Sequence, residues 1–370
     1  MKITETLNNF KLSRYIVSQL FTSVLFTLRR FYKLFKIKYG SIVIISLHRL
    51  GDSVFTFRAI QEIQKYYKQE LIILCYSESI PVYKIGIKNV SYCSVERSDF
   101  YFNNRIASRY ARKQLNKYNA ATIIDLTGVM TSASLIFNSK AGNIIGMNRE
   151  IFKGIYDLFT NISYKSHLSE MYLNVAKLLT GKIENNDFEI FPGTNQKVDK
   201  IIIHPFAGWK AKEWNLNKFV KLAQELSKTY QVSCLFPSNS LSKDIEEEIK
   251  NFKIDIIQTK TVEELITALK NCSLLIGNDS GPIHIASILG KATFTIYGPS
   301  NPSFTLPYSP NHGYYQKRIK CSPIPTENLC FTDGGRYGCP AFECMNQLSV
   351  EEVYSSIKSF INDLERKSNA

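Results

Sequence analysis

The feature that most constrains the fold is a strand and helix alternation that runs through half of the chain and then starts again. In the first half, apolar runs of strand length alternate with segments of helical apolar spacing, at 41–47, 53–67, 71–75, 104–118, 121–126 and 167–179. Strands buried on both faces are typical of parallel sheets whose crossover helices cover both sides. The first half is therefore predicted to form a Rossmann-like α/β domain.

The same plan returns after a polar connection at 182–199, which contains Pro192 and Gly193 and has no sustained periodicity. The second series is expected at 200–204, 215–230, 232–236, 241–251, 254–257, 262–271, 273–277, 282–289 and 292–297. A chain of 370 residues has room for two such domains. The predicted organisation is an N-terminal extension, an N-terminal domain, a C-terminal domain and a last amphipathic helix that packs back on the N-terminal domain, at 1–39, 40–185, 186–348 and 349–370.

The charge balance points to acidic partners. Lys and Arg number 46 against 32 Asp and Glu, which gives a formal net charge of +14. This excess favours nucleic acid, phosphorylated sugars or an anionic membrane surface. No zinc-finger spacing, aromatic RNA-binding motif or basic region leading into heptads is present, so nucleic acid is not the expected partner.

Eight cysteines in this length are too few for a disulfide-built scaffold, which indicates the cytoplasm. No uninterrupted apolar stretch reaches the about 18 residues of a membrane-spanning helix. Four cysteines gather late, but gaps of eight, eight and four residues match no CxxC zinc pattern. Free thiols and a metal or redox clip both remain open for these residues, which are Cys321, Cys330, Cys339 and Cys344.

Residues 1–39 are basic and rich in aromatic residues, and they precede the first predicted strand. Such a segment can lie in a membrane interface with its cations toward the lipid headgroups. It fits equally well a helix packed on the protein's own surface. The sequence leaves both interpretations open.

The first motif with chemical content is SLHRLGDS at 46–53, where the first predicted strand ends and a helix begins. Ligands of open parallel sheets bind outside the carboxyl ends of the strands. Gly51 permits a tight turn, and Asp52 can project toward the ligand as a general base for a hydroxyl. Asp52 or Ser53 fits equally well the N-cap of the helix.

The second motif, GNDSGPIH at 277–284, again joins a strand end to a helix. Ser280 and Gly281 offer backbone N–H groups at a helix N-terminus, which favours an anion such as a diphosphate. Asp279 would repel phosphate unless it orients amides, hydroxyls or a neighbouring cation. His284 is interpreted as a core histidine or as part of this predicted phosphate site.

The third motif, HPFAGWKAKEW at 204–214, follows the first strand of the second half. Its two lysines place positive charge beside a strand end, and Lys212 is the favoured ligand for a leaving diphosphate. A solvated lysine pair on an ordinary loop is the alternative.

These motifs together resemble glycosyltransferase family 9, the lipopolysaccharide core heptosyltransferases, which have the GT-B fold of two Rossmann-like domains with parallel sheets facing across a cleft. The resemblance covers residues 41–365 and does not include the basic extension. Its landmarks occur in the family's order as RLGD at 49–52, HPFAGWKAKEW at 204–214, GNDSGPIHIASILGKATFTIYGPSNP at 277–302 and CM…LSVEEV at 344–353.

The resemblance implies roles for individual residues. Asp52 matches the catalytic base, and Arg49, Gly51 and Ser53 belong to the loop on the acceptor side. Lys212 matches the lysine that binds the diphosphate. The donor-phosphate loop corresponds to Asp279, Ser280 and Gly281, with His284 beside it, and an acidic residue that contacts the ribose or base is expected at Glu246 or Glu247.

The resemblance also implies an inverting transfer of heptose from ADP-heptose to a phosphorylated, lipid-linked, Kdo-bearing acceptor at the inner face of the cytoplasmic membrane. No cofactor or metal is expected, because no Asp-x-Asp triplet or His-rich cluster occurs. Two alternatives remain: another nucleotide sugar used for a different surface glycan, and a nucleotide-sugar binding protein without catalysis.

Overall fold

The computed structural model describes residues 2–183, 197–307, 311–330, 339 and 341–368, with side chains from residue 16 onward. It contains two six-stranded sheets in which every described strand pair is parallel. The strand orders are β3-β2-β1-β5-β6-β7 and β10-β9-β8-β11-β12-β13, which is the same Rossmann-like order used twice. The predicted pair of Rossmann-like domains is confirmed.

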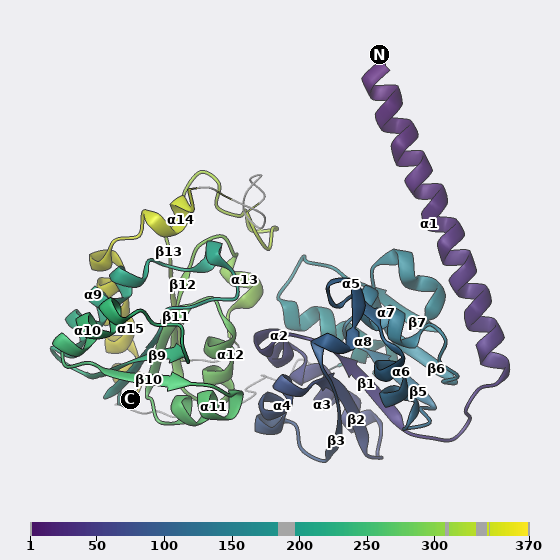
Figure 1. The fold of residues 1–370 in the computed structure, drawn as a ribbon, viewed down its shortest axis with the longest axis horizontal. Helices are drawn as coiled ribbons and strands as arrows, with labels where there is room; N and C mark the ends of the chain where they lie inside the picture. The colour runs from purple at the N-terminus through teal and green to yellow at the C-terminus, as the bar shows by residue number, and fades with distance from the viewer. Residues whose placement is uncertain (1, 184–196, 308–310, 331–338, 340, 369–370) are drawn as a thin grey trace.

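The first sheet lies in residues 42–161 and is flanked by helices on both faces (Figure 1). Its strands are β1 (Ile42–Ser46), β2 (Leu71–Tyr76), β3 (Val90–Val95), β5 (Thr122–Asp125), β6 (Asn143–Asn148) and β7 (Leu158–Asn161). A two-residue strand, β4 (Ile106–Ala107), lies outside this sheet. The helices are α2 (Leu50–Phe55), α3 (Phe57–Tyr66), α4 (Ile80–Gly86), α5 (Tyr101–Asn104), α6 (Arg109–Asn116), α7 (Met130–Ile136) and α8 (Leu168–Thr180), with 3-10 turns η1 (Ser77–Ser79), η2 (Arg97–Asp99) and η3 (Glu150–Ile155).

The second sheet repeats the plan in residues 200–316. Its strands are β8 (Lys200–His204), β9 (Gln231–Pro237), β10 (Asp255–Thr259), β11 (Leu274–Asn278), β12 (Ala292–Tyr297) and β13 (His312–Gln316). The helices are α9 (Leu216–Ser227), α10 (Lys243–Asn251), α11 (Val262–Lys270), α12 (Gly281–Ile288), α13 (Pro302–Thr305), α14 (Glu343–Asn346) and α15 (Val350–Ser368), with the 3-10 turn η4 (Lys210–Lys212). The boundary predicted at 185/186 and most of the connection at 182–199 fall outside the described residues.

The expectation that the last helix packs on the N-terminal domain was wrong. Helix α15 lies against α9 and β13 of the second domain. The reason is its apolar face, which completes the core of that domain, as in the contact of Phe360 with Phe294 at a ring-centroid distance of 5.6 Å. The buried residues on that face are Val353, Ile357, Ile361 and Leu364.

The N-terminal extension forms one long helix, α1 (Lys2–Leu34), which projects beyond the first domain in Figure 1. Its C-terminal half packs on η3, where Leu25 and Arg29 are buried. The interpretation as a helix packed on the protein's surface is therefore confirmed for this half. Among the described helices, none is both long and apolar enough to cross a membrane.

The two domains meet through helices that begin at the carboxyl ends of β1 and β11. Helices α2 and α12 pack on one another, and α4 contacts α11. The apolar core of the first domain continues across this interface, because Phe55 of α2 contacts the ring of His284 of α12 at a ring-centroid distance of 4.7 Å. A second contact joins His167 to the carbonyl oxygen of Leu306, at 2.8 Å. The two strand-end motifs are thus brought face to face.

Candidate functional site

Gly51 lies directly against the second domain. A Cβ atom at this position would lie 3.1 Å from Cα of Gly281 and 3.1 Å from Cδ2 of His284. Such contacts are tighter than nearly all real Cβ contacts, so a side chain here would require Gly281 and His284 to shift. Glycine at position 51 therefore lets the first motif lie directly against the second.

The third motif joins the same place. A Cβ atom at Gly208 would lie 3.3 Å from a terminal guanidinium nitrogen of Arg49, so the arginine of the first domain reaches the 204–214 loop. Asn278 ties that loop to the end of β11, since its amide donates to the Pro205 carbonyl at 2.7 Å and its oxygen accepts from the Trp214 amide at 3.1 Å. All three motifs therefore meet between the two domains, at the carboxyl ends of strands β1, β8 and β11.

Lys212 and Asp279 form the central ion pair. The Lys212 Nζ lies 2.5 Å from Oδ2 of Asp279, whose Oδ1 lies 3.8 Å from Nε2 of His284. Burial by itself would raise the pKa of Asp279, but the Lys212 ammonium and His284 outweigh it and hold the pKa well below its usual range. Asp279 therefore stays ionised and orients the Lys212 ammonium, which is the neighbouring cation that a carboxylate beside a phosphate site requires.

Ser280 and Gly281 begin helix α12 directly after this pair. Ser280 is the N-cap residue, Pro282 follows in the first turn, and the Ser280 hydroxyl makes no cap hydrogen bond. That hydroxyl oxygen is buried, and within the described part of the chain it has no hydrogen-bond partner. Unpaired polar groups at a helix N-terminus, next to a lysine, form a site suited to an anion.

Asp52 lies in the first turn of α2 and is partly exposed. The interpretation of Asp52 or Ser53 as the N-cap was wrong, because the helix begins at Leu50 and Arg49 is the N-cap residue. Ser53 is buried, and its hydroxyl donates to the Arg49 carbonyl oxygen at 3.1 Å. Ser53 therefore stabilises the turn, while the side chain of Asp52 is partly exposed to solvent.

The sequence analysis missed the part played by His48, although its motif includes the residue. Its Nε2 lies 3.1 Å from the Leu126 carbonyl oxygen, so this nitrogen carries the proton. Burial lowers the pKa of His48, and the nearby Asp52 carboxylate and the Leu126 carbonyl only partly oppose that shift. His48 is thus a neutral, hydrogen-bonded neighbour of Asp52, which no residue-type pattern would have indicated.

Glu246 is placed differently from the other predicted residues. It lies on α10, and its carboxylate accepts a hydrogen bond from Lys250 of the same helix at 2.6 Å. No described contact joins it to Lys212 or Asp279. Its predicted role toward the ribose or base stays a prediction.

The late cysteines lie near one another, and all are free thiols. Burial is the largest cause that raises the pKa of Cys344 to about 12, and the thiols of Cys330, Cys321 and Cys339 contribute to the same rise in that order. Within the described ranges, no group of three or more His, Cys, Asp or Glu side chains is arranged to hold a metal ion.

Comparison with known proteins gives the same picture as the geometry. Residues 109–329 match the sequence model of glycosyltransferase family 9 (heptosyltransferase). Lipooligosaccharide heptosyltransferase 2 of Campylobacter jejuni serotype O:2 is 24% identical over 342 residues, which cover 85% of this chain and 96% of the relative.

Two solved structures share the fold over most of this chain. The E. coli ADP-heptose lps heptosyltransferase II has a TM-score of 0.65 at 16% identity and covers 88% of this chain and 99% of its own. The family 9 glycosyl transferase of Veillonella parvula has a TM-score of 0.69 at 19% identity, with 89% and 99% covered. The predicted GT-B arrangement is confirmed.

Proposed function

The chain belongs to glycosyltransferase family 9 (heptosyltransferase) and is a glycosyltransferase, and from this premise we propose that it moves heptose from ADP-heptose to the lipopolysaccharide inner core. The observation that carries the proposal is the contact of Gly51 with Gly281 across the domain interface. It brings the turn that holds Asp52, which is partly exposed, against the start of α12, next to the Lys212–Asp279 pair. The similar proteins named above support the choice of sugar and acceptor, since one is a lipooligosaccharide heptosyltransferase and another an ADP-heptose lps heptosyltransferase.

The proposed reaction is a single displacement with inversion. The Asp52 carboxylate takes the proton of an acceptor hydroxyl while the hydroxyl oxygen attacks the anomeric carbon of the heptose. The bond from that carbon to the diphosphate oxygen breaks, and ADP leaves with its electron pair. Burial lowers the pKa of the neighbouring His48, so Asp52 rather than His48 is the proposed proton acceptor.

The leaving diphosphate gains negative charge, and the second domain supplies the groups that stabilise it. Lys212 provides a cation held by Asp279, and the first turn of α12 provides backbone N–H groups at Ser280 and Gly281. Because protein groups supply this positive charge, we propose that the transfer needs no metal ion. An acidic, phosphorylated acceptor also suits the net charge of +14.

The direct test is to incubate the protein with a panel of nucleotide sugars and delipidated core acceptors, with and without EDTA, and to identify products by mass and anomeric configuration. Transfer of heptose alone, with inversion and in EDTA, is the expected result. Transfer from a different nucleotide sugar would reassign the donor to the alternative of another surface glycan. Tight nucleotide binding without any product would support a binding protein instead.

The acceptor is proposed to be lipid-linked, so we place the reaction at the inner face of the cytoplasmic membrane. From the resemblance to the family, we propose that the first domain, with its loop at 49–53, binds the acceptor. Cell fractionation followed by activity measurement on the membrane and supernatant fractions tests this location.

A further inference from the structure

Helix α1 exposes apolar side chains on the side that faces away from the protein. Positions 16, 17, 20, 24, 31 and 34 fall on one side of an α-helix, and all six residues there are between 49% and 78% exposed. A helix of a globular protein normally buries such a stripe. We call it the outer face of α1, and its members are Ile16, Val17, Leu20, Val24, Phe31 and Leu34.

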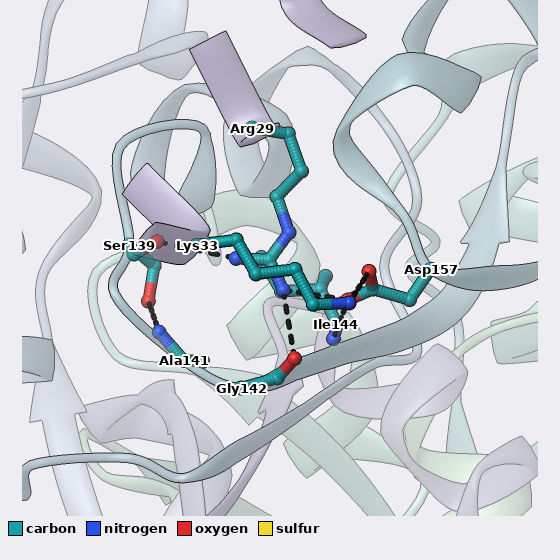
Figure 2. Close-up of polar contacts among 7 residues, drawn as sticks. All are labelled: Arg29, Lys33, Ser139, Ala141, Gly142, Ile144 and Asp157. Atoms are coloured by element: carbon teal, nitrogen blue, oxygen red, sulfur yellow. Dashed lines mark hydrogen bonds and ion pairs between the residues drawn. The ribbon is translucent and has the colours of Figure 1, made fainter. Parts of the chain in front are cut away.

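The opposite side of the helix is fixed to the first domain by polar contacts (Figure 2). Arg29 lies 2.5 Å from Oδ2 of Asp157 and donates to the carbonyl oxygen of Gly142 at 3.2 Å. Lys33 donates to Oδ1 of the same aspartate at 2.6 Å. Burial alone would raise the pKa of Asp157, but the two cations lower it, so the carboxylate is charged and paired.

The backbones are also in close contact at this point. A Cβ atom at Gly154 would overlap the carbonyl oxygen of Thr22, and the Thr22 hydroxyl donates to the Ile151 carbonyl at 3.2 Å. A helix held at these points cannot rotate to bury its outer face on its own domain. The outer face is therefore left for a partner.

The charges around the outer face indicate which partner. Glu5 is the only acidic residue among residues 1–39. Arg30 lies 4.9 Å over the ring of Phe26, and both side chains are exposed, as are Lys36 and Lys38 just after the helix. Two copies of this chain packed through their outer faces would bring these cations together, whereas anionic lipid headgroups would neutralise them.

We propose that α1 lies on an anionic membrane surface with its outer face in the lipid interface, and that the Arg29–Asp157–Lys33 contacts hold the first domain at a fixed orientation to that surface. Figure 1 shows α1 on the side of the first domain away from the second, so the proposed acceptor domain is next to the lipid. Only the purpose of this attachment rests on the proposed function, because a lipid-linked acceptor would be reached at the same membrane surface.

The test is sedimentation of the full chain with phosphatidylcholine vesicles that contain or lack phosphatidylglycerol. Val24→Asp changes the outer face, and Ile324→Asp on the second domain is its control, with matched exposures of 56% and 54%. The wild type and the control are expected to bind the anionic vesicles. Val24→Asp is expected to bind them at least about tenfold more weakly, because it loses an apolar side chain that would be buried in the lipid interface.

Two further measurements separate the rival outcomes. Unchanged vesicle binding by Val24→Asp, or no binding by the wild type, would overturn the proposal. So would a lipid-free dimer in analytical ultracentrifugation that Val24→Asp dissociates, because the outer face would then be a contact between copies. Transfer to a delipidated acceptor is expected to be equal in all three proteins, so a failure of the membrane proposal is distinguishable from a failure of the proposed function.

Discussion

Asp125 and Asp279 hold corresponding places in the two sheets, yet the pKa values of their carboxyl groups are shifted in opposite directions. Both stand at the carboxyl end of the fourth strand in the order, β5 in the first sheet and β11 in the second. Both are buried. Burial raises the pKa of Asp125, and its hydrogen bonds do not compensate, whereas Lys212 and His284 turn the pKa of Asp279 downward.

The difference between the two lies in their partners. Asp125 accepts hydrogen bonds from the Tyr156 hydroxyl at 2.6 Å and from the Thr127 and Gly128 amides at 2.8 and 3.1 Å. These are neutral groups that shape a turn. Asp279 has a cation, Lys212, that is also available to a ligand. The residue at this position thus stabilises a turn in the first domain, whereas in the second domain it holds a lysine in place.

Asp52 differs from both, because it is partly exposed and belongs to the first turn of a helix. We expect Asp52→Asn to lower kcat by ~10²–10⁴-fold, the usual loss when a general base is removed. Donor binding should be unchanged, since the Lys212–Asp279 pair is intact. Steady-state kinetics and calorimetric titration with ADP-heptose measure the two quantities. Near-normal turnover would exclude Asp52 as the base.

Lys212→Ala is expected to weaken ADP binding by about 10–100-fold, the range of one lost charge-assisted hydrogen bond. The binding of adenosine should change much less, because the lysine is proposed to meet the phosphates. Isothermal titration with both ligands checks this.

Lys210→Ala is the matched control, since Lys210 is 80% exposed and pairs with Glu213 at the surface. Equal losses for ADP and adenosine, or an equal effect of Lys210→Ala, would mean that Lys212 does not contact the diphosphate.

The central strands of both sheets were predictable, because burial on both faces leaves a continuous apolar run. The limits of β8 and β12 agree with the prediction to the residue. Strands β3, β7 and β13 were missed, and each lies at a sheet edge with several partly or fully exposed residues. Interior strand β6 was missed too, because Asn143, Gly146 and Asn148 interrupt its apolar residues.

The site was predictable as a set of loops but not as a geometry. Ser280 and Gly281 stand at the start of a helix as the sequence indicated, because strand, glycine and proline signals are local. The contact of Gly51 with Gly281 depends on how two domains pack, and the pairing of Lys212 with Asp279 joins residues 67 positions apart. The long-range arrangement follows from helix packing at the interface, which local patterns do not encode.

The smallest effect is expected at Asp125, where Asn can keep the same contacts. An asparagine oxygen can accept from the Thr127 and Gly128 amides, and its amide can donate to the Tyr156 hydroxyl oxygen. A raised folded-state pKa gives stability that is present below the unfolded pKa of about 3.9 and is lost as pH rises through the folded value. Because the asparagine keeps these hydrogen bonds, Asp125→Asn should change the free energy of unfolding by about 1 kcal/mol or less at pH 7.

Relative to the wild type, the same variant should be less stable at acidic pH, where the protonated wild-type carboxyl is at its most favourable. Urea unfolding at acidic and neutral pH, with kcat measured at neutral pH, tests both parts. The comparison of the two aspartates predicts unchanged ADP affinity for this variant. A loss of ADP affinity as large as that of Lys212→Ala would show that Asp125 takes part in ligand binding. Its role would then not be purely structural, and the contrast with Asp279 would be wrong.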